Sequence, residues 1–192
     1  MTLKRFHIRS VRGIFRAKDG VSAVEFALIA PLMLLMYAGC IELSLMMQLD
    51  RKVTTSTATL GDLTARATEI TNDDLDDIFE ATRMIFQPND ITAARMRVTS
   101  VREDDGDAVV DWSDACNMPE YTVDQVLTVP ANIIQEDGSV ILAEIEYDYE
   151  SKIGGLFTTK QTLTDRFYLR PRRVDLVSRN ETSPFTCNHN AP

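Results

Sequence analysis

The chain has 192 residues, with 20 Lys and Arg against 29 Asp and Glu, which gives a net charge of −9. The charges are segregated: residues 1–20 carry six basic side chains and one acidic one, residues 21–49 carry only Glu25 and Glu42, and residues 50–192 carry 14 basic and 26 acidic ones. The acidic bulk would repel phosphate, which argues against a nucleic-acid-binding protein. The nearly uncharged segment argues against a purely cytosolic globular protein.

That segment predicts a single transmembrane helix over residues 21–49. The sixteen residues from Phe26 to Ile41 carry no charge. About 20 apolar residues cross a bilayer as a helix, and a soluble core helix would need a polar face that this segment lacks. Six Lys and Arg precede the span, and three follow it within twenty residues. The positive-inside rule therefore places a basic leader, residues 1–20, in the cytoplasm and the acidic part outside.

The N-terminus is compatible with three kinds of segment. A secretory signal peptide should end in small residues at a cleavage site. Tyr37-Ala38-Gly39-Cys40 loosely resembles a lipoprotein processing site, but Tyr37 stands where a small aliphatic residue is expected and the apolar pattern continues past Cys40. An uncleaved anchor is the second interpretation. The third is cleavage after Gly20, immediately before the apolar run, which would give Val21 a free amine.

Glu25 lies five residues inside the apolar run. A carboxylate there is costly and needs a reason. In one interpretation Glu25 lies near the cytoplasmic interface and stays hydrated. In the other, cleavage after Gly20 makes it the fifth residue of the mature chain, where it neutralises the terminal amine of a neighbouring subunit.

Pro31 removes one hydrogen bond of the helix. It is either a tolerated kink or a place where the helix locally unwinds.

Gly20, the pair Glu25-Phe26 and the stretch ALIAPLMLL with its proline resemble the prepilin processing motif of TadE-like pseudopilins. These proteins belong to the tight-adherence (Tad, Flp) pilus system, a branch of the type IV pilus family. The resemblance covers residues 13–70 well and the C-terminal region loosely. It implies a minor pilin of the bacterial inner membrane that acts in assembly of adhesive pili, with a prepilin peptidase and other pilin-like subunits as partners. It also implies processing at Gly20 and Val21 and assembly roles for Glu25, Phe26 and Pro31.

Residues 50–90 are predicted to be helical. Apolar residues recur along one stripe at alternating steps of four and three, so the first helix should continue to residue 70. We expect this stripe to pack on the chain's own sheet. A coiled coil is the alternative, for which the stripe is less suitable. The stripe is Leu49, Val53, Ser56, Leu60, Leu63, Ala67 and Ile70. A second helix is expected to start at Thr71-Asn72-Asp73-Asp74 and to end before Pro88. The acidic cluster at its start lacks the glycine and distal glutamate of a calcium loop.

Residues 91–192 predict an antiparallel sheet domain with a C-terminal tail of about a dozen residues. Residues 95–100 and 108–112 flank a turn at Asp104-Asp105-Gly106-Asp107 and read as a hairpin. Residues 140–150 alternate apolar and acidic side chains, and residues 162–170 resume the alternation. We expect a sheet with one wet, acidic face. The fold class is therefore α+β, with a long N-terminal helix, a second short helix and an antiparallel sheet as the head.

The sequence predicts a protein that is not an enzyme and has no cofactor or metal. It has two histidines, His7 and His189, and no phosphate loop, CxxC or HExxH motif. Cys116 and Cys187 both fall in the exported part, where disulfides persist, so we expect them to form a disulfide; two free thiols are the alternative. The alternative functions are an unprocessed, single-pass anchored periplasmic adaptor of a secretion system and a membrane-tethered hydrolase using acidic residues.

Overall fold

The structure is a computed structural model that describes residues 20–130, 133–135, 138–151, 160–181 and 183–187. Most of the basic leader, the glycine pair at 154–155 and both histidines lie outside the described residues. The chain forms two compact units, Met1–Leu43 and Ser44–Pro192. We call the second unit the head. The boundary between them falls inside the first helix, so each unit is described by itself.

The helix α1 spans Val21–Arg66, 46 residues, and continues through Pro31. Its part in the head presents a buried stripe that includes Leu49, Val53, Ser56 and Leu60, and this stripe packs on the sheet as predicted. Gly61 brings the helix close to the sheet, because a Cβ at this position would collide with Leu169 and lie 3.3 Å from the Cβ of Ala143. The helix was expected to run to residue 70, but it ends at Arg66.

The short helix α2 spans Asn72–Met84 and begins at the predicted position. Thr71 and Asp74 form a capping box: the Thr71 hydroxyl accepts from the Asp74 backbone N–H at 3.2 Å, and the Asp74 carboxylate accepts from the Thr71 N–H at 3.0 Å. The apolar face buries Leu75 and Phe79. A 3₁₀ turn, η3 (Ile91–Ala93), then leads into the sheet.

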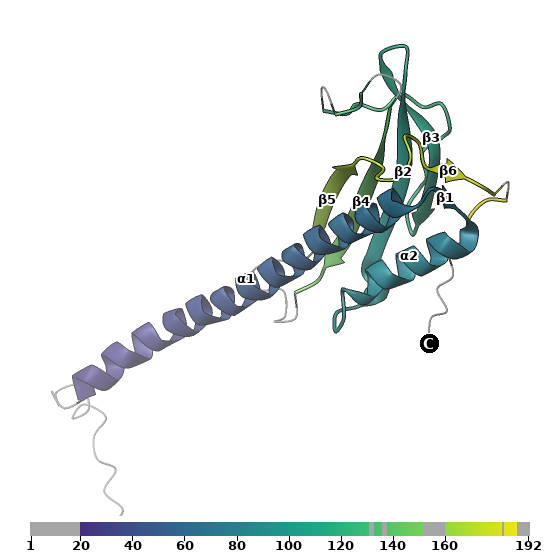
Figure 1. Cartoon of the computed structure of the whole chain (residues 1–192). Helices are drawn as coiled ribbons and strands as arrows, with labels where there is room; N and C mark the ends of the chain where they lie inside the picture. The colour runs from purple at the N-terminus through teal and green to yellow at the C-terminus, as the bar shows by residue number, and fades with distance from the viewer. Residues whose placement is uncertain (1–19, 131–132, 136–137, 152–159, 182, 188–192) are drawn as a thin grey trace, which may run out of the picture. The chain divides into compact units, whose positions relative to one another are not determined.

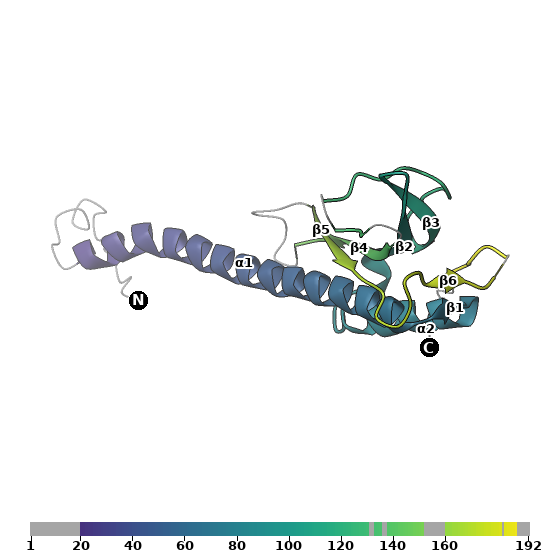
Figure 2. The same ribbon diagram turned by 45° about the horizontal axis from the view of Figure 1, so that its top comes forward.

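The sheet consists of β2 (Ala94–Asp104), β3 (Asp107–Cys116), β4 (Ser139–Tyr149) and β5 (Gln161–Leu169). Its order is β3-β2-β4-β5, and every neighbouring pair is antiparallel. Asp105 and Gly106 both have positive φ at the β2–β3 turn, which suits the two-residue hairpin predicted there. Figures 1 and 2 show α2 and the head's part of α1 on the same face of this sheet. The α+β fold class is confirmed.

The inner face of the sheet, toward the helices, carries most of the core. Met96, Val98, Ala143 and Ile145 are fully buried there. The outer face was expected to be wet and acidic, and this is only partly right. The side chains of Glu146 and Asp148 are 35% and 20% exposed, but Glu144 is 3% exposed and bound by Arg97, which stands opposite it in the register. Strand alternation shows which residues share a face but not which charges stand opposite them.

The C-terminal part of the chain is fastened to the head as far as the structure describes it, and residues 182 and 188–192 of the expected tail lie outside the described residues. The two-residue strand β6 (Ser178–Arg179) pairs in parallel with β1 (Glu69–Ile70), just beyond the end of α1. Farther along, the ring of Phe185 lies 5.4 Å from that of Phe79 on α2. The Trp112 indole N–H donates to the Val177 carbonyl at 2.7 Å. These contacts tie the described part of residues 170–187, which we call the C-terminal strap, to β1, α2 and the sheet.

Candidate functional site: the N-terminal helical segment and the head

The predicted processing site lies at the start of α1. Gly20 is exposed and directly precedes the helix, whose first residue is Val21. A Cβ built on Gly20 would meet no atom within 4 Å, and its φ is not in the left-handed region. Neither packing in the described chain nor backbone conformation therefore requires glycine at this position. A requirement for glycine would have to come from a second molecule that approaches the backbone closely.

The predicted assembly residues, Glu25, Phe26 and Pro31, are all exposed along the same helical segment. Phe26 is 70% exposed. Glu25 follows Val21 by four residues, so the two share one face of the helix, about 6 Å apart along the axis at 1.5 Å per residue. The segment thus places a carboxylate about one turn from the position where cleavage after Gly20 would create an amine.

The first unit exposes a continuous apolar helix surface. Between residues 24 and 37, ten large apolar side chains are 48–75% exposed. They are Val24, Phe26, Leu28, Ile29, Leu32, Met33, Leu34, Leu35, Met36 and Tyr37. Among the described residues, α1 is the one helix long and apolar enough to cross a membrane, by length and composition. Such a surface needs a cover of lipid or protein, because contiguous apolar patches of this size rarely face water.

Cys116 and Cys187 form a disulfide, as predicted, with their Cα atoms 5.3 Å apart. Cys116 is fully buried at the end of β3. Arg83, in the last turn of α2, donates one Nη to the sulfurs of both cysteines, at 3.1 and 3.2 Å. Sequence reasoning missed Arg83. The available signal was its position four residues after Phe79, which places it on the apolar face of α2.

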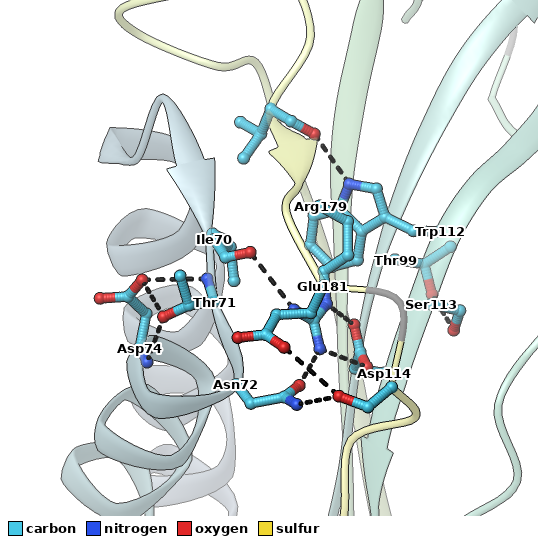
Figure 3. Close-up of polar contacts among 12 residues, drawn as sticks. Ile70, Thr71, Asn72, Asp74, Thr99, Trp112, Ser113, Asp114, Arg179 and Glu181 are labelled. Atoms are coloured by element: carbon cyan, nitrogen blue, oxygen red, sulfur yellow. Dashed lines mark hydrogen bonds and ion pairs between the residues drawn. The ribbon is translucent and has the colours of Figure 1, made fainter.

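A second buried arginine, Arg179, connects three elements (Figure 3). Its Nε lies 2.9 Å from Asp114 of β3, and its guanidinium also donates to the Ile70 carbonyl and to the Asn72 side chain. The side chains of Arg179 and Asp114 are 10% and 8% exposed. Desolvation and the nearby Asp114 carboxylate raise the pKa of Glu120. Nothing in the sequence pairs these residues, because 65 positions separate Asp114 from Arg179.

The outer face of the sheet has its own polar cluster. Arg97 binds Glu144 through Nε and Nη2 at 2.8 and 2.6 Å. The Tyr121 ring lies under the Arg97 guanidinium, with 3.7 Å between the guanidinium carbon and the ring centre, and the Pro119 carbonyl accepts from Arg97 Nη1 at 2.7 Å. Every named contact is internal to the head, so this cluster fastens the segment after β3 onto the sheet rather than presenting a reactive group.

One cavity of the head, about 500 Å³, lies between α1 and β4 and is lined by residues that include Leu49, Tyr147 and Tyr149. Within the part of the chain that the structure describes, no group of three or more His, Cys, Asp or Glu side chains is arranged to hold a metal ion.

Residues 20–59 match the model of a protein family described as TadE-like protein. The match begins at Gly20 and covers the apolar part of α1 and the first half of its buried stripe. The predicted resemblance to TadE-like proteins is therefore confirmed for this segment. It does not extend to α2 or the sheet. No curated protein and no solved structure matches the chain.

Proposed function

We propose that this protein is a pseudopilin or minor pilin-like membrane protein that is needed for assembly of Tad (Flp) adhesive pili and is processed by a prepilin peptidase. One observation carries the proposal: an exposed apolar helix begins at Val21, and the TadE-like match begins one residue earlier. Gly20 then lies at the boundary between the basic leader and the helix.

The apolar helix acts first as a membrane anchor and then as a packing surface for other pilin-like subunits. Both environments cover the same side chains, because lipid tails and apolar helix faces exclude water alike. The six basic side chains of the leader keep the N-terminus cytoplasmic. The head then lies in the periplasm of a bacterial inner membrane. The Cys116–Cys187 disulfide supports this location, since disulfides persist in oxidising compartments.

Processing creates the charge that assembly uses. Hydrolysis after Gly20 leaves the Val21 amine at the helix start, one turn from the Glu25 carboxylate. In a low-dielectric helix bundle each charge needs a partner, and a neighbouring subunit displaced along the axis supplies one. Phe26 and Pro31, exposed on the same segment, are available to contact such a neighbour. Among the described residues no side chain packs on Gly20, so none of them hinders the approach of the peptidase.

The test is the intact mass of the protein purified from its native membrane. Cleavage after Gly20 removes 20 of the 192 residues and leaves 172, beginning at Val21. Gly20→Lys should leave the precursor intact, because a long charged side chain blocks the close approach of the peptidase. Gly13→Lys, the same change at another leader glycine, should be cleaved normally. A full-length chain in cells with active prepilin peptidase would contradict the proposal and favour the unprocessed periplasmic adaptor.

A further inference from the structure

Arg83 is a buried cation whose charge is only partly compensated. Its side chain is 5% exposed, and its ion-pair partner, Glu80, lies at 3.5 Å. Charge-assisted hydrogen bonds are usually 2.7–2.9 Å long. Within the described part of the chain, the second carboxylate oxygen of Glu80 is buried and has no hydrogen-bond partner. The remaining polar contacts of the guanidinium go to two neutral disulfide sulfurs. A buried cation in this state would gain from an additional negative charge beside it.

The two sulfurs differ in accessibility. Cys116 is 0% exposed and belongs to the core between the sheet and α2. Cys187 is half-buried at the end of the C-terminal strap. A second protein that exchanges a disulfide with this pair must bring one of its own sulfur atoms into contact with the sulfur of Cys116 or of Cys187. Of the two cysteines in the described residues, Cys187 is the less buried, so its sulfur is the one that such an approach reaches first.

We propose that Cys187 is a thiol–disulfide exchange site for a disulfide-bearing oxidoreductase, and that Arg83 is a positioning residue that holds reduced Cys187 as the thiolate. Among the described residues, Arg83 contacts both sulfurs and is paired with Glu80 of α2, and Asp114, two residues before Cys116 on β3, is paired with Arg179. A cation beside a cysteine lowers the pKa of its thiol from about 8.5. Arg83, in contact with both sulfurs, is the nearest of these charges.

The exchange proceeds in two balanced steps. The Cys187 thiolate attacks one sulfur of the oxidoreductase disulfide, forming a mixed disulfide and releasing the other sulfur as a thiolate. The Cys116 thiol then loses its proton to solvent and attacks the Cys187 sulfur. The protein disulfide forms, and the oxidoreductase leaves with both of its sulfurs reduced. The second step also fixes the strap in place, because Phe185 lies two residues before Cys187 and packs on Phe79.

The experiment uses the full chain in detergent micelles, carrying Cys40→Ser to remove the exposed third thiol, with oxidised glutathione as the probe. The reduced protein is alkylated with iodoacetamide across a pH series, and rates at each cysteine are read by peptide mass spectrometry. We expect the thiol pKa of Cys187 to lie below 8.5 and Arg83→Gln to raise it. Raising it by one unit cuts the thiolate about tenfold, and the gain in nucleophilicity offsets part of this, so glutathionylation at pH 7 should slow about threefold.

Two further variants separate charge from packing. Arg83→Lys keeps the cation and should retain most of the lowered pKa, whereas Arg95→Gln, on the outer face of the sheet, should leave it unchanged. In concentrated guanidinium chloride all variants should react alike, because the effect depends on the folded head. The wild-type measurements remain decisive even where a variant does not fold. The proposal is overturned by an ordinary thiol pKa at Cys187, by equal pKa values in folded wild type and Arg83→Gln, or by glutathione appearing first on Cys116.

Discussion

Arg179 of the C-terminal strap binds Asp114 of β3 with 2.9 Å between Nε and Oδ2, and both side chains are about nine-tenths buried. The same guanidinium donates to the Ile70 carbonyl, just before α2. One ion pair therefore fastens the strap to the sheet and to the connection between the two helices. Asp114 would be a buried, uncompensated carboxylate without it.

Replacing Arg179 with Met should lower the free energy of unfolding by about 3–5 kcal/mol, because a buried carboxylate loses its partner. Adding Asp114→Asn should recover part of this loss, since the neutral amide is cheaper to bury. Urea unfolding of the full chain in detergent measures both. The control is Arg66→Met, which removes an ion pair from an arginine side chain that is 60% exposed and should change stability by less than about 1 kcal/mol. Equal losses at Arg66 and Arg179 would contradict this account.

Gly61→Ala should be destabilising in the wild-type head and less so when Leu169 is shortened. The added methyl collides with Leu169 and lies 3.3 Å from Ala143, whose Cβ cannot rotate away. Overpacking costs about 1–3 kcal/mol, against a helix-propensity gain of about 1 kcal/mol for Ala over Gly. A double-mutant cycle with Leu169→Ala should show coupling of about 1–2 kcal/mol between the two positions. Additive effects would mean that helix and sheet do not touch there.

The capping box should make stability depend on pH through Asp74. Hydrogen bonds from the side chain and backbone of Thr71 lower the pKa of the Asp74 carboxyl. A lowered folded-state pKa stabilises the fold above the unfolded value of about 3.9, and this stabilisation is lost as the pH falls through the folded value. Asp74→Asn should cost about 1 kcal/mol at pH 7, as other helix-cap changes do. The difference from wild type should shrink below pH ~4.

Glu120 provides a control in which stability should change with pH in the opposite direction from Asp74. Its pKa is raised by desolvation and by Asp114, so the folded state disfavours its carboxylate. A raised folded-state pKa destabilises the fold at neutral pH, and the penalty disappears as the pH falls below the unfolded value of about 4.3. Glu120→Gln should therefore raise the free energy of unfolding at pH 7 and have no effect at pH ~3. Parallel pH profiles for Asp74→Asn and Glu120→Gln would refute both assignments.

Alkylation of the denatured protein should label only Cys40 before reduction, and Cys40, Cys116 and Cys187 after it. The disulfide spans 71 positions, and closing a loop of this length contributes about 4 kcal/mol in the chain-entropy model. Paired Cys→Ser changes at 116 and 187 should lower stability by up to that amount, whereas Cys40→Ser should not. Peptide mapping that finds both thiols free in exported protein would contradict the disulfide.

Glu25→Ala should be processed normally yet fail to associate with other pilin-like subunits. Under the proposed function, peptidase recognition depends on Gly20 and the leader, whereas assembly needs the carboxylate. Removing one partner of a buried charge pair costs about 3–5 kcal/mol, which lowers association more than a hundredfold. Crosslinking in native membranes, with Glu25→Gln alongside, measures this. Equal recovery of subunit complexes from wild type and both variants would eliminate charge pairing and leave Glu25 as a hydrated interfacial residue.

Local patterns in the sequence determined the elements of this protein. The uncharged run predicted a helix because a single apolar span crosses a bilayer only with its backbone hydrogen bonds made within the segment. The period of the stripe from Leu49 to Leu60 brought α1 onto the sheet, and the Thr71 cap and the Asp105-Gly106 turn started α2 and closed the hairpin where expected. These features depend on residues within a few positions of one another. The TadE-like segment was recognisable for the same reason, since its motif is contiguous.

Only the tertiary structure decided how the charges and the C-terminus are used. Arg97 neutralises Glu144 from 47 positions away, Asp114 is bound by Arg179, and Phe185 packs on α2. Sequence patterns show that such residues share a face or lie in a polar stretch, but not which partner stands opposite. Strand order and register fix those partners, and they arise from closing loops of dozens of residues. The carboxylates of the outer face are therefore paired with arginines, and the described end of the chain is held on α2 by Phe185 and on the sheet by the Cys116–Cys187 disulfide.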